Sequence, residues 1–165
     1  MGKVGRKMKG TETMKIEIKP FHGDALTKED LDQMVALFRQ LDNDEIADYG
    51  NIGLKMEEVG DFYLSDKIEE DSGFIAMCDG KIVGMVSNVE ADEYENAMFL
   101  SRLVVDTNCR RKGIGRRLME RAMKNNDARG KRTMLNVSVR NDAALSLYKS
   151  LGFVVHSQTM VSSAT

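Results

Sequence analysis

The sequence predicts an α/β (α+β) fold in a single domain, and three local patterns support this prediction. Residues 14–19 alternate between apolar and polar side chains, as in a half-buried strand. Asp79-Gly80 separates two strand-like runs and is a strong signal for a two-residue hairpin turn. Residues 103–115 combine a short apolar run, a basic glycine loop and the start of an amphipathic helix. A chain of 165 residues has room for one such core.

The first two expected elements are a strand and a helix. The strand begins near Met14 and ends at Pro20, because proline cannot donate to a strand ladder. Thr27 can cap the following helix, with Asp30 three residues later. Apolar residues then recur at helical spacing, namely Leu31, Met34, Val35, Phe38 and Leu41.

The middle of the chain predicts a less regular helical region and then a hairpin. Apolar residues recur through 51–69, but Gly53 and Gly60 weaken a helix there. The runs 73–78 and 81–89 flank the Asp79-Gly80 turn, so we expect two paired antiparallel strands.

The second half predicts further alternating elements. A strand at 97–105 leads into the glycine loop, and the helix after the loop packs its apolar side on the sheet. A strand-like run covers 133–139, and a short helix at 143–150 stops at Gly152. The remaining residues, 154–165, are enough for one long strand or two short ones.

The glycine loop has the chemistry of an anion site. Gly113 and Gly115 let the backbone turn sharply, and the first amides of the next helix have no partners within it. Five cations surround these glycines: Arg110, Arg111, Lys112, Arg116 and Arg117. Cations beside a helix start suit a multiply charged phosphate.

Two common phosphate loops are excluded. The loop is not Gly-x-Gly-x-x-Gly, because Leu118 occupies the position of the third glycine. No Gly-Lys-Ser or Gly-Lys-Thr occurs, so the magnesium-binding hydroxyl of a P-loop is missing. Residues 110–115 instead have the pattern Arg-x-x-Gly-x-Gly.

A second motif lies downstream, at 141–153. It has the pattern Asn-x-x-Ala-x-x-Leu-Tyr-x-x-x-Gly-Phe. Together with 110–115, it resembles the GNAT superfamily of N-acetyltransferases, strongly over 99–153 and compatibly over 14–90. The resemblance implies the GNAT fold, a central mixed, mostly antiparallel, splayed β-sheet flanked by about four helices.

The resemblance also implies an acetyl-CoA-dependent acyltransferase that passes the acetyl group directly to a primary amine. Tyr148 would be the general acid, because a hydroxyl with a pKa of about 10 can donate to the departing sulfur. The other interpretation of Tyr148 is a core tyrosine. A backbone amide near 103–105 would bind the oxyanion. The residues expected to contact acetyl-CoA or coenzyme A are Leu103, Val104, Val105, Arg110, Arg111, Lys112, Gly113, Ile114, Gly115, Arg116, Asn141, Ala144 and Tyr148.

Two roles remain open. Asn141 can contact the cofactor, cap the helix that follows, or do both. The general base that many relatives carry as Glu is absent, because Ser101 stands at that position. A base acting through water could come from one of the nearby acids Glu90, Asp92, Glu93 or Glu95, or the acceptor could arrive neutral. Arg102 could bind an acceptor carboxylate, but strand alternation leaves its direction open.

The acceptor is not identified by the sequence. Acidic residues fall in two segments expected near the acceptor, namely Asp42, Asp44, Glu45 and Asp48, and Asp92, Glu93 and Glu95. They favour a cationic amine, from a small molecule or from a peptide. A non-catalytic acyl-CoA-binding sensor is the alternative from another class. Nucleic-acid binding ranks below both, because the loop cations belong to a phosphate loop and residues 14–165 are acidic.

Composition adds a few expectations. The segment 1–13 is basic and glycine-containing, which predicts a disordered extension before a single domain at 14–165. No apolar run is long enough to cross a membrane, so we expect a cytoplasmic protein. The two cysteines, Cys78 and Cys109, lack metal spacing, which predicts no metal site. A shortened sheet end would favour a homodimer.

Overall fold

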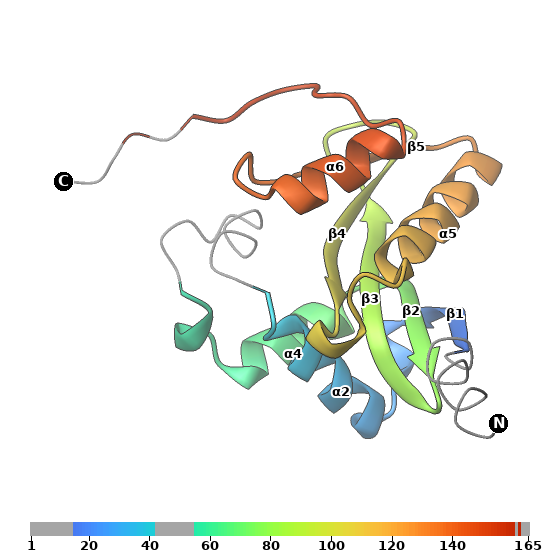
Figure 1. The fold of residues 1–165 in the computed structure, drawn as a ribbon, viewed down its shortest axis with the longest axis vertical. Helices are drawn as coiled ribbons and strands as arrows, with labels where there is room; N and C mark the ends of the chain where they lie inside the picture. Colours follow the sequence, from blue (N-terminus) through green and yellow to red (C-terminus); the bar gives the residue numbers. More distant parts are fainter. Residues whose placement is uncertain (1–14, 42–54, 161, 163–165) are drawn as a thin grey trace, which may run out of the picture.

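The protein is built around one five-stranded sheet, shown in Figure 1. The computed structural model describes residues 15–41, 55–160 and 162. The strands are β1 Ile16–His22, β2 Ser72–Cys78, β3 Lys81–Glu90, β4 Ala97–Val105 and β5 Arg132–Leu135, in that spatial order. The main helices are α2 Lys28–Phe38, α4 Asp61–Glu69, α5 Ile114–Ala128 and α6 Asp142–Ser150. The first four strands pair antiparallel and β5 runs parallel to β4, which confirms a mixed, mostly antiparallel sheet.

Helices cover both faces of the sheet (Figure 1). Alternate strand residues point to opposite faces, so Ile75 and Met85 pack with the α2 and α4 side chains. Their neighbours Phe74 and Val86 pack with α5 on the other face. The two cores are therefore separated by the sheet.

The first strand departs from the sequence prediction. Pro20 does not end β1, because the strand continues to His22 and Pro20 lies opposite Phe74. Proline is tolerated in an edge strand, where its missing N–H faces away from the partner.

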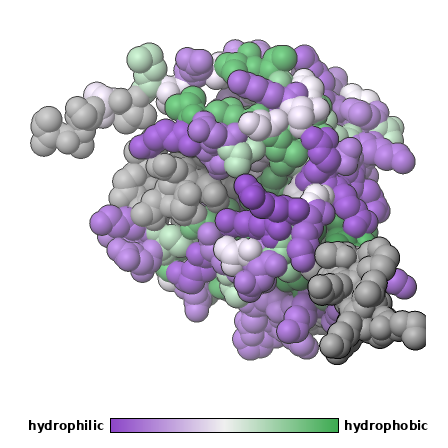
Figure 2. All heavy atoms as spheres, viewed as in Figure 1, coloured by the Kyte–Doolittle hydropathy of each residue, from purple (hydrophilic) through white to green (hydrophobic). Residues whose placement is uncertain are grey.

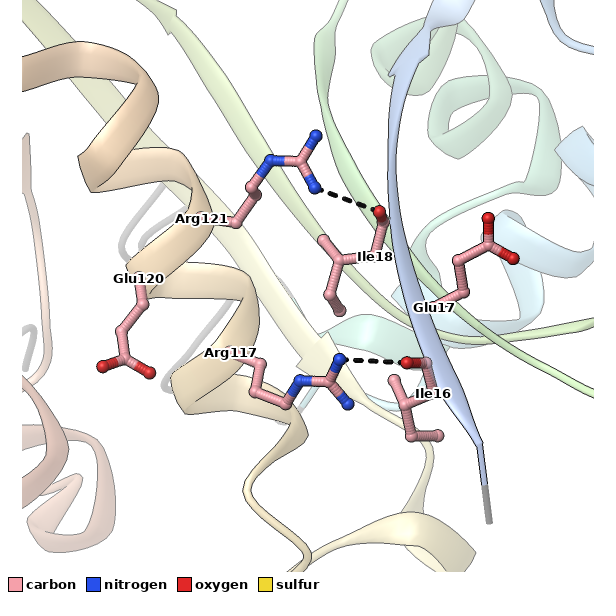
Figure 3. Close-up of a pocket in the computed structure, with 6 residues that line it drawn as sticks. All are labelled: Ile16, Glu17, Ile18, Arg117, Glu120 and Arg121. Carbon is pink, nitrogen blue, oxygen red and sulfur yellow. Dashed lines mark hydrogen bonds between the residues drawn. The ribbon is translucent and has the colours of Figure 1, made fainter. Parts of the chain in front are cut away.

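Side chains of α5 cover the outer edge of β1. Arg117 and Arg121 donate to the carbonyl oxygens of Ile16 and Ile18, at 2.9 and 3.1 Å (Figure 3). A hollow of about 460 Å³ lies between this strand and the helix.

The segments between β1 and β3 largely match the expected elements. Thr27 caps α2 by accepting from the Asp30 amide at 3.1 Å. The predicted helical region at 51–69 is divided, since residues 51–54 lie outside the described part and a 3₁₀ turn, Met56–Glu58, precedes α4. Gly60 forms the N-cap of α4 rather than an interior position. Asp79 and Gly80 both have positive φ, as a two-residue hairpin turn requires.

The C-terminal part is less regular than predicted. The strand predicted at 133–139 is limited to β5, and no strand forms among the described residues after α6, which are 151–160 and 162. Val154 is 85% and Met160 is 93% exposed. Figure 2 shows apolar surface over α6 and the chain that follows it. The predicted extension at 1–13 lies outside the described residues.

Candidate functional site

The strand β4 carries a bulge near its C-terminal end. Ser87 of β3 lies opposite Ser101, whereas Met85 lies opposite Val104, so β4 has one extra residue between these pairs. Arg102 lies in this bulge with a φ of 50°. The bulge turns two consecutive side chains, Ser101 and Arg102, toward the α2 face, and Arg102 donates to the Ser101 hydroxyl at 3.3 Å.

Beyond the bulge, β4 separates from β5. Their parallel pairing runs from Ala97–Arg132 to Leu100–Leu135 and ends there. Val104 is buried in the α2 core, whereas Leu103 and Val105 pack toward α5. The expected splay is therefore observed between β4 and the edge strand β5, where the sequence predicted contacts with acetyl-CoA.

The glycine loop presents an uncapped helix start. Asp106 begins the loop by accepting from the Asn108 amide at 3.0 Å. Arg111 and Gly113 have positive φ values of 64° and 78°, and Gly113 is the N-cap of α5 without a side-chain hydrogen bond. The first-turn amides of a 15-residue helix therefore point outward without a capping side chain, which suits a bound anion.

The loop cations divide into two groups. Arg111 and Lys112 are exposed, and Arg110 donates to the carbonyl oxygen of Val105 at 3.1 Å. Arg116 donates to the hydroxyl of Ser150 at the end of α6. The sequence groups Arg117 with the loop cations, but its guanidinium bonds β1 instead, because it projects from the side of α5 that faces that edge.

The second motif places α6 beside the glycine loop. A Cβ added at Gly115 would lie 3.7 Å from Val105 and 3.9 Å from Leu147, so β4, α5 and α6 meet at this glycine. Ile114 is buried at the same junction. Tyr148 is half-buried, and its ring packs against Phe153 with centroids 5.9 Å apart.

Asn141 acts as the predicted cap of α6. Its side chain accepts from the amide of Ala144 at 3.1 Å. The capping role is therefore confirmed, while the alternative contact with the cofactor stays a prediction.

A buried polar cluster adjoins the bulge on the α2 face. Arg102 forms an ion pair with Asp71, and the side chains are 12% and 10% exposed. Ser87 donates to the same carboxylate at 2.8 Å. Burial is the main influence on the Asp71 carboxyl and raises its pKa, against the opposing effect of Arg102. The Arg102 guanidinium also lies 5.5 Å from the ring centre of Phe38.

The acidic side chains considered as bases lie at the other end of β4. Glu90 pairs with Lys131 at 2.9 Å, and this hydrogen bond lowers the pKa of the Glu90 carboxyl. The remaining acids of the turn between β3 and β4 line a hollow of about 350 Å³, namely Asp92, Glu93 and Glu95. Figure 1 shows this turn and the glycine loop at opposite ends of the strand. The acidic segment 42–48 lies outside the described residues.

Sequence reasoning missed the Asp71 cluster. Asp71 and Ser87 carry no motif, and they approach Arg102 only through strand pairing. The one available signal was Arg102, whose direction alternation could not settle. The bulge shifts that alternation by one residue, which is why Arg102 faces α2 and not α5.

Two kinds of feature, membrane-spanning helices and metal-ligand groups, are missing from the described residues. No helix among them is long and apolar enough to cross a membrane. Within the same ranges, no group of three or more potential metal ligands is close enough to hold an ion.

Comparisons with known proteins identify similar chains. The model described as "Acetyltransferase (GNAT) family" matches residues 31–153. N-acetylaspartate synthetase of Xenopus tropicalis is 34% identical over 102 residues, covering 59% of this chain and 35% of that protein. An uncharacterized N-acetyltransferase of Methanocaldococcus jannaschii is 30% identical over 138 residues, covering 78% of this chain and 58% of that protein. The chain thus spans between about a third and three fifths of these curated relatives.

One solved structure shows the same fold. It is the PaiA N-acetyltransferase from Thermoplasma acidophilum in complex with coenzyme A, with a TM-score of 0.66 and 23% identity. The match covers 88% of this chain and 94% of that one.

Proposed function

The chain belongs to the GNAT acetyltransferase family, and we propose that it transfers the acetyl group of acetyl-CoA to a primary amine by direct attack. The observation that carries this proposal is that the splayed end of β4 follows the bulge directly and leads into the uncapped start of α5. An activated acyl group and its phosphates would have complementary surfaces at these two places.

Acetyl-CoA supplies an activated thioester when bound. Its phosphates would lie against the first-turn amides of α5, with Arg110, Arg111, Lys112 and Arg116 nearby. The open space around Gly113, where an added Cβ would meet nothing within 4 Å, fits this role. The pantetheine arm would run along Leu103, Val104 and Val105, where β4 has no pairing with β5.

The chain's own groups can serve two catalytic roles. A backbone amide near 103–105 would donate to the developing oxyanion. The Tyr148 hydroxyl would donate a proton to the departing sulfur, as an unperturbed phenol with a pKa of about 10 can do at neutral pH. Support for Tyr148 comes from α6, which contacts the first turn of α5 through Arg116 and Ser150.

The acceptor has two chemical candidates. The exposed acids of the β3–β4 turn favour a cationic amine. The relative named N-acetylaspartate synthetase suggests an amino acid such as aspartate. An acceptor carboxylate would need a cation other than Arg102, since that side chain is paired with Asp71.

A non-catalytic acyl-CoA sensor is the second candidate function. It is favoured by Ser101, which replaces the Glu that would serve as base. A sensor would bind acetyl-CoA without turnover and would not need the Tyr148 hydroxyl.

The first experiment combines acetyl-CoA binding by calorimetry with thiol release over an amine panel. The panel contains a polyamine, an aminoglycoside, a lysine peptide, an alanine N-terminal peptide and aspartate. Binding with turnover that falls at least about tenfold in Tyr148→Phe supports the transferase with a general acid. Binding without turnover supports the sensor, and the absence of binding overturns the site.

The proposal extends to assembly and location. We expect a homodimer through the outer edge of β5, which has no strand partner among the described residues. Light scattering at the mass of a single chain would contradict this expectation. A cytoplasmic location stays a prediction, which fractionation of cells expressing the tagged chain would test.

A further inference from the structure

Asp71, Ser87 and Arg102, which we call the bulge-anchoring cluster, have no part so far in the proposed reaction. We propose that Asp71, acting through Arg102, is a positioning residue that fixes the β4 bulge. It would thereby fix the direction of the Leu103 amide toward the acetyl carbonyl. This inference rests on the proposed function, because it assigns a role within the same site.

The backbone at Arg102 needs an external restraint. Its φ of 50° is in the left-handed region, which residues with a Cβ rarely adopt. Such conformations persist where surrounding groups determine them, and they concentrate at functional sites. Leu103 follows Arg102 directly, so a relaxation at Arg102 would rotate the Leu103 amide and loosen the pairing of Val104 with Met85 of β3.

The Arg102 side chain supplies this restraint. It pairs with Asp71, contacts the Ser101 hydroxyl at 3.3 Å and lies over the Phe38 ring. The pair is nearly buried, so water and salt screen it little. Removing either partner would leave an uncompensated charge in the interior.

Asp71 is itself held by backbone and side-chain bonds. Its amide donates to Ile68 at 3.0 Å, and its carbonyl accepts from Gly23 at 2.7 Å. Ser87 donates to its carboxylate and lies opposite Ser101 on the neighbouring strand. The cluster therefore joins the start of β2 to β3 and β4 at the level of the bulge.

The bonds to the Asp71 carboxylate favour positioning over proton transfer. Arg102 and Ser87 both donate to Oδ2. This oxygen is already occupied by a guanidinium and a hydroxyl, and the Asp71 side chain is only 10% exposed, so an incoming amine has little access to the carboxylate. Its effect on the reaction would therefore pass through Arg102.

The kinetic test uses Asp71→Asn, with the best acceptor from the amine panel. We expect kcat to fall about tenfold, since complete loss of an oxyanion donor costs about 10²–10³. The Kd for acetyl-CoA and the KM for the amine should change less than about twofold, because the phosphates would bind at the start of α5 and not at the cluster. Asp61→Asn is the matched control, since it removes the Arg39 ion pair between α2 and α4 and should leave kcat unchanged.

A conservative variant of Arg102 distinguishes a positioning role from a general effect on folding. Arg102→Lys keeps a cation for Asp71 and should retain more of the parent kcat than Arg102→Ala. Active sites are counted by coenzyme A titration, so a loss of folded protein is not read as a loss of kcat. Equal kcat in Arg102→Lys and Arg102→Ala, or parental kcat in Asp71→Asn, would overturn the inference.

Amide hydrogen exchange gives a readout that needs no turnover. In Asp71→Asn, exchange at Leu103 and Val104 should rise at least about tenfold, with α5 amides unchanged. Unchanged exchange at both residues overturns the inference even if the parent is inactive. If the parent fails to bind acetyl-CoA while exchange rises as expected, the proposed function fails and the anchoring of the bulge is retained.

Discussion

The α2 core differs strongly in packing from the part of the molecule formed by α6, β5 and the chain after α6, which we call the α6 side; the α5 core between them is buried. In the α2 core, Met34, Leu64 and Ile68 are fully buried. On the α6 side, α6 and β5 contain no buried residue, and Val154 is exposed beyond them. The candidate site lies on the border between these regions. Binding regions commonly lie in the less stable part of a protein. A bound ligand would therefore reduce local motion most on the α6 side.

Truncating a side chain in the α2 core should destabilise the protein much more than truncating one on the α6 side. Leu64→Ala should lower the free energy of unfolding by about 2–5 kcal/mol, because it opens a cavity in the α2 core. Val154→Ala should change it by less than about 0.5 kcal/mol. Urea denaturation of both variants checks this prediction, and similar losses would remove the contrast.

Coenzyme A should reduce the difference in local stability between the α2 core and the α6 side. At about 100 times its Kd it should stabilise the fold by about 2.7 kcal/mol. Hydrogen exchange should slow in α6 and in the first turn of α5, while interior α2 amides change no more than the global stability requires. Protection confined to α2 would place the ligand elsewhere.

A buried amide pair joins β3 and α5 to β5. Asn88 and Asn126 bond each other at 2.9 and 3.0 Å, and Asn126 also donates to Thr133 of β5 at 3.0 Å. Asn126→Ala should cost about 1–3 kcal/mol, because Asn88 is left buried without its partner. The exposed neighbour variant Asn125→Ala should cost less than about 0.5 kcal/mol in the same denaturation series. Equal costs would show that the pair does not stabilise the junction of β3, α5 and β5.

The smallest effect is expected at the cap of α6. Asn141→Ala should cost about 1 kcal/mol, since the Ala144 amide loses its acceptor. Asn141→Asp should restore most of that loss. Exchange at Ala144 measures both variants, and an unchanged rate in Asn141→Ala would show that water replaces the cap.

The sequence predicted the elements with strong local patterns. The bounds of β4 and the hairpin at Asp79-Gly80 follow from apolar runs and turn residues, and the structure confirms them. Pro20 misled the prediction because its effect depends on strand position in the sheet, which only tertiary pairing decides.

The site was predictable only in its motif-bearing half. The glycine loop and the α6 cap were visible as local signals. The direction of Arg102 depends on a bulge, and the approach of Asp71 depends on residues distant in sequence. Such long-range pairings leave no periodic trace in one chain.

The Arg117 and Arg121 bonds to β1 have a consequence for how many neighbours the sheet can accept. With Pro20 lacking an N–H and the Ile16 and Ile18 carbonyls already bonded, that edge offers little to an incoming strand. Only the outer edge of β5 would then be open to strand pairing, so the sheet could accept one neighbouring strand. Two chains that pair through this one edge would form a closed dimer. A sheet with two open edges could instead add further chains and grow into a fibre.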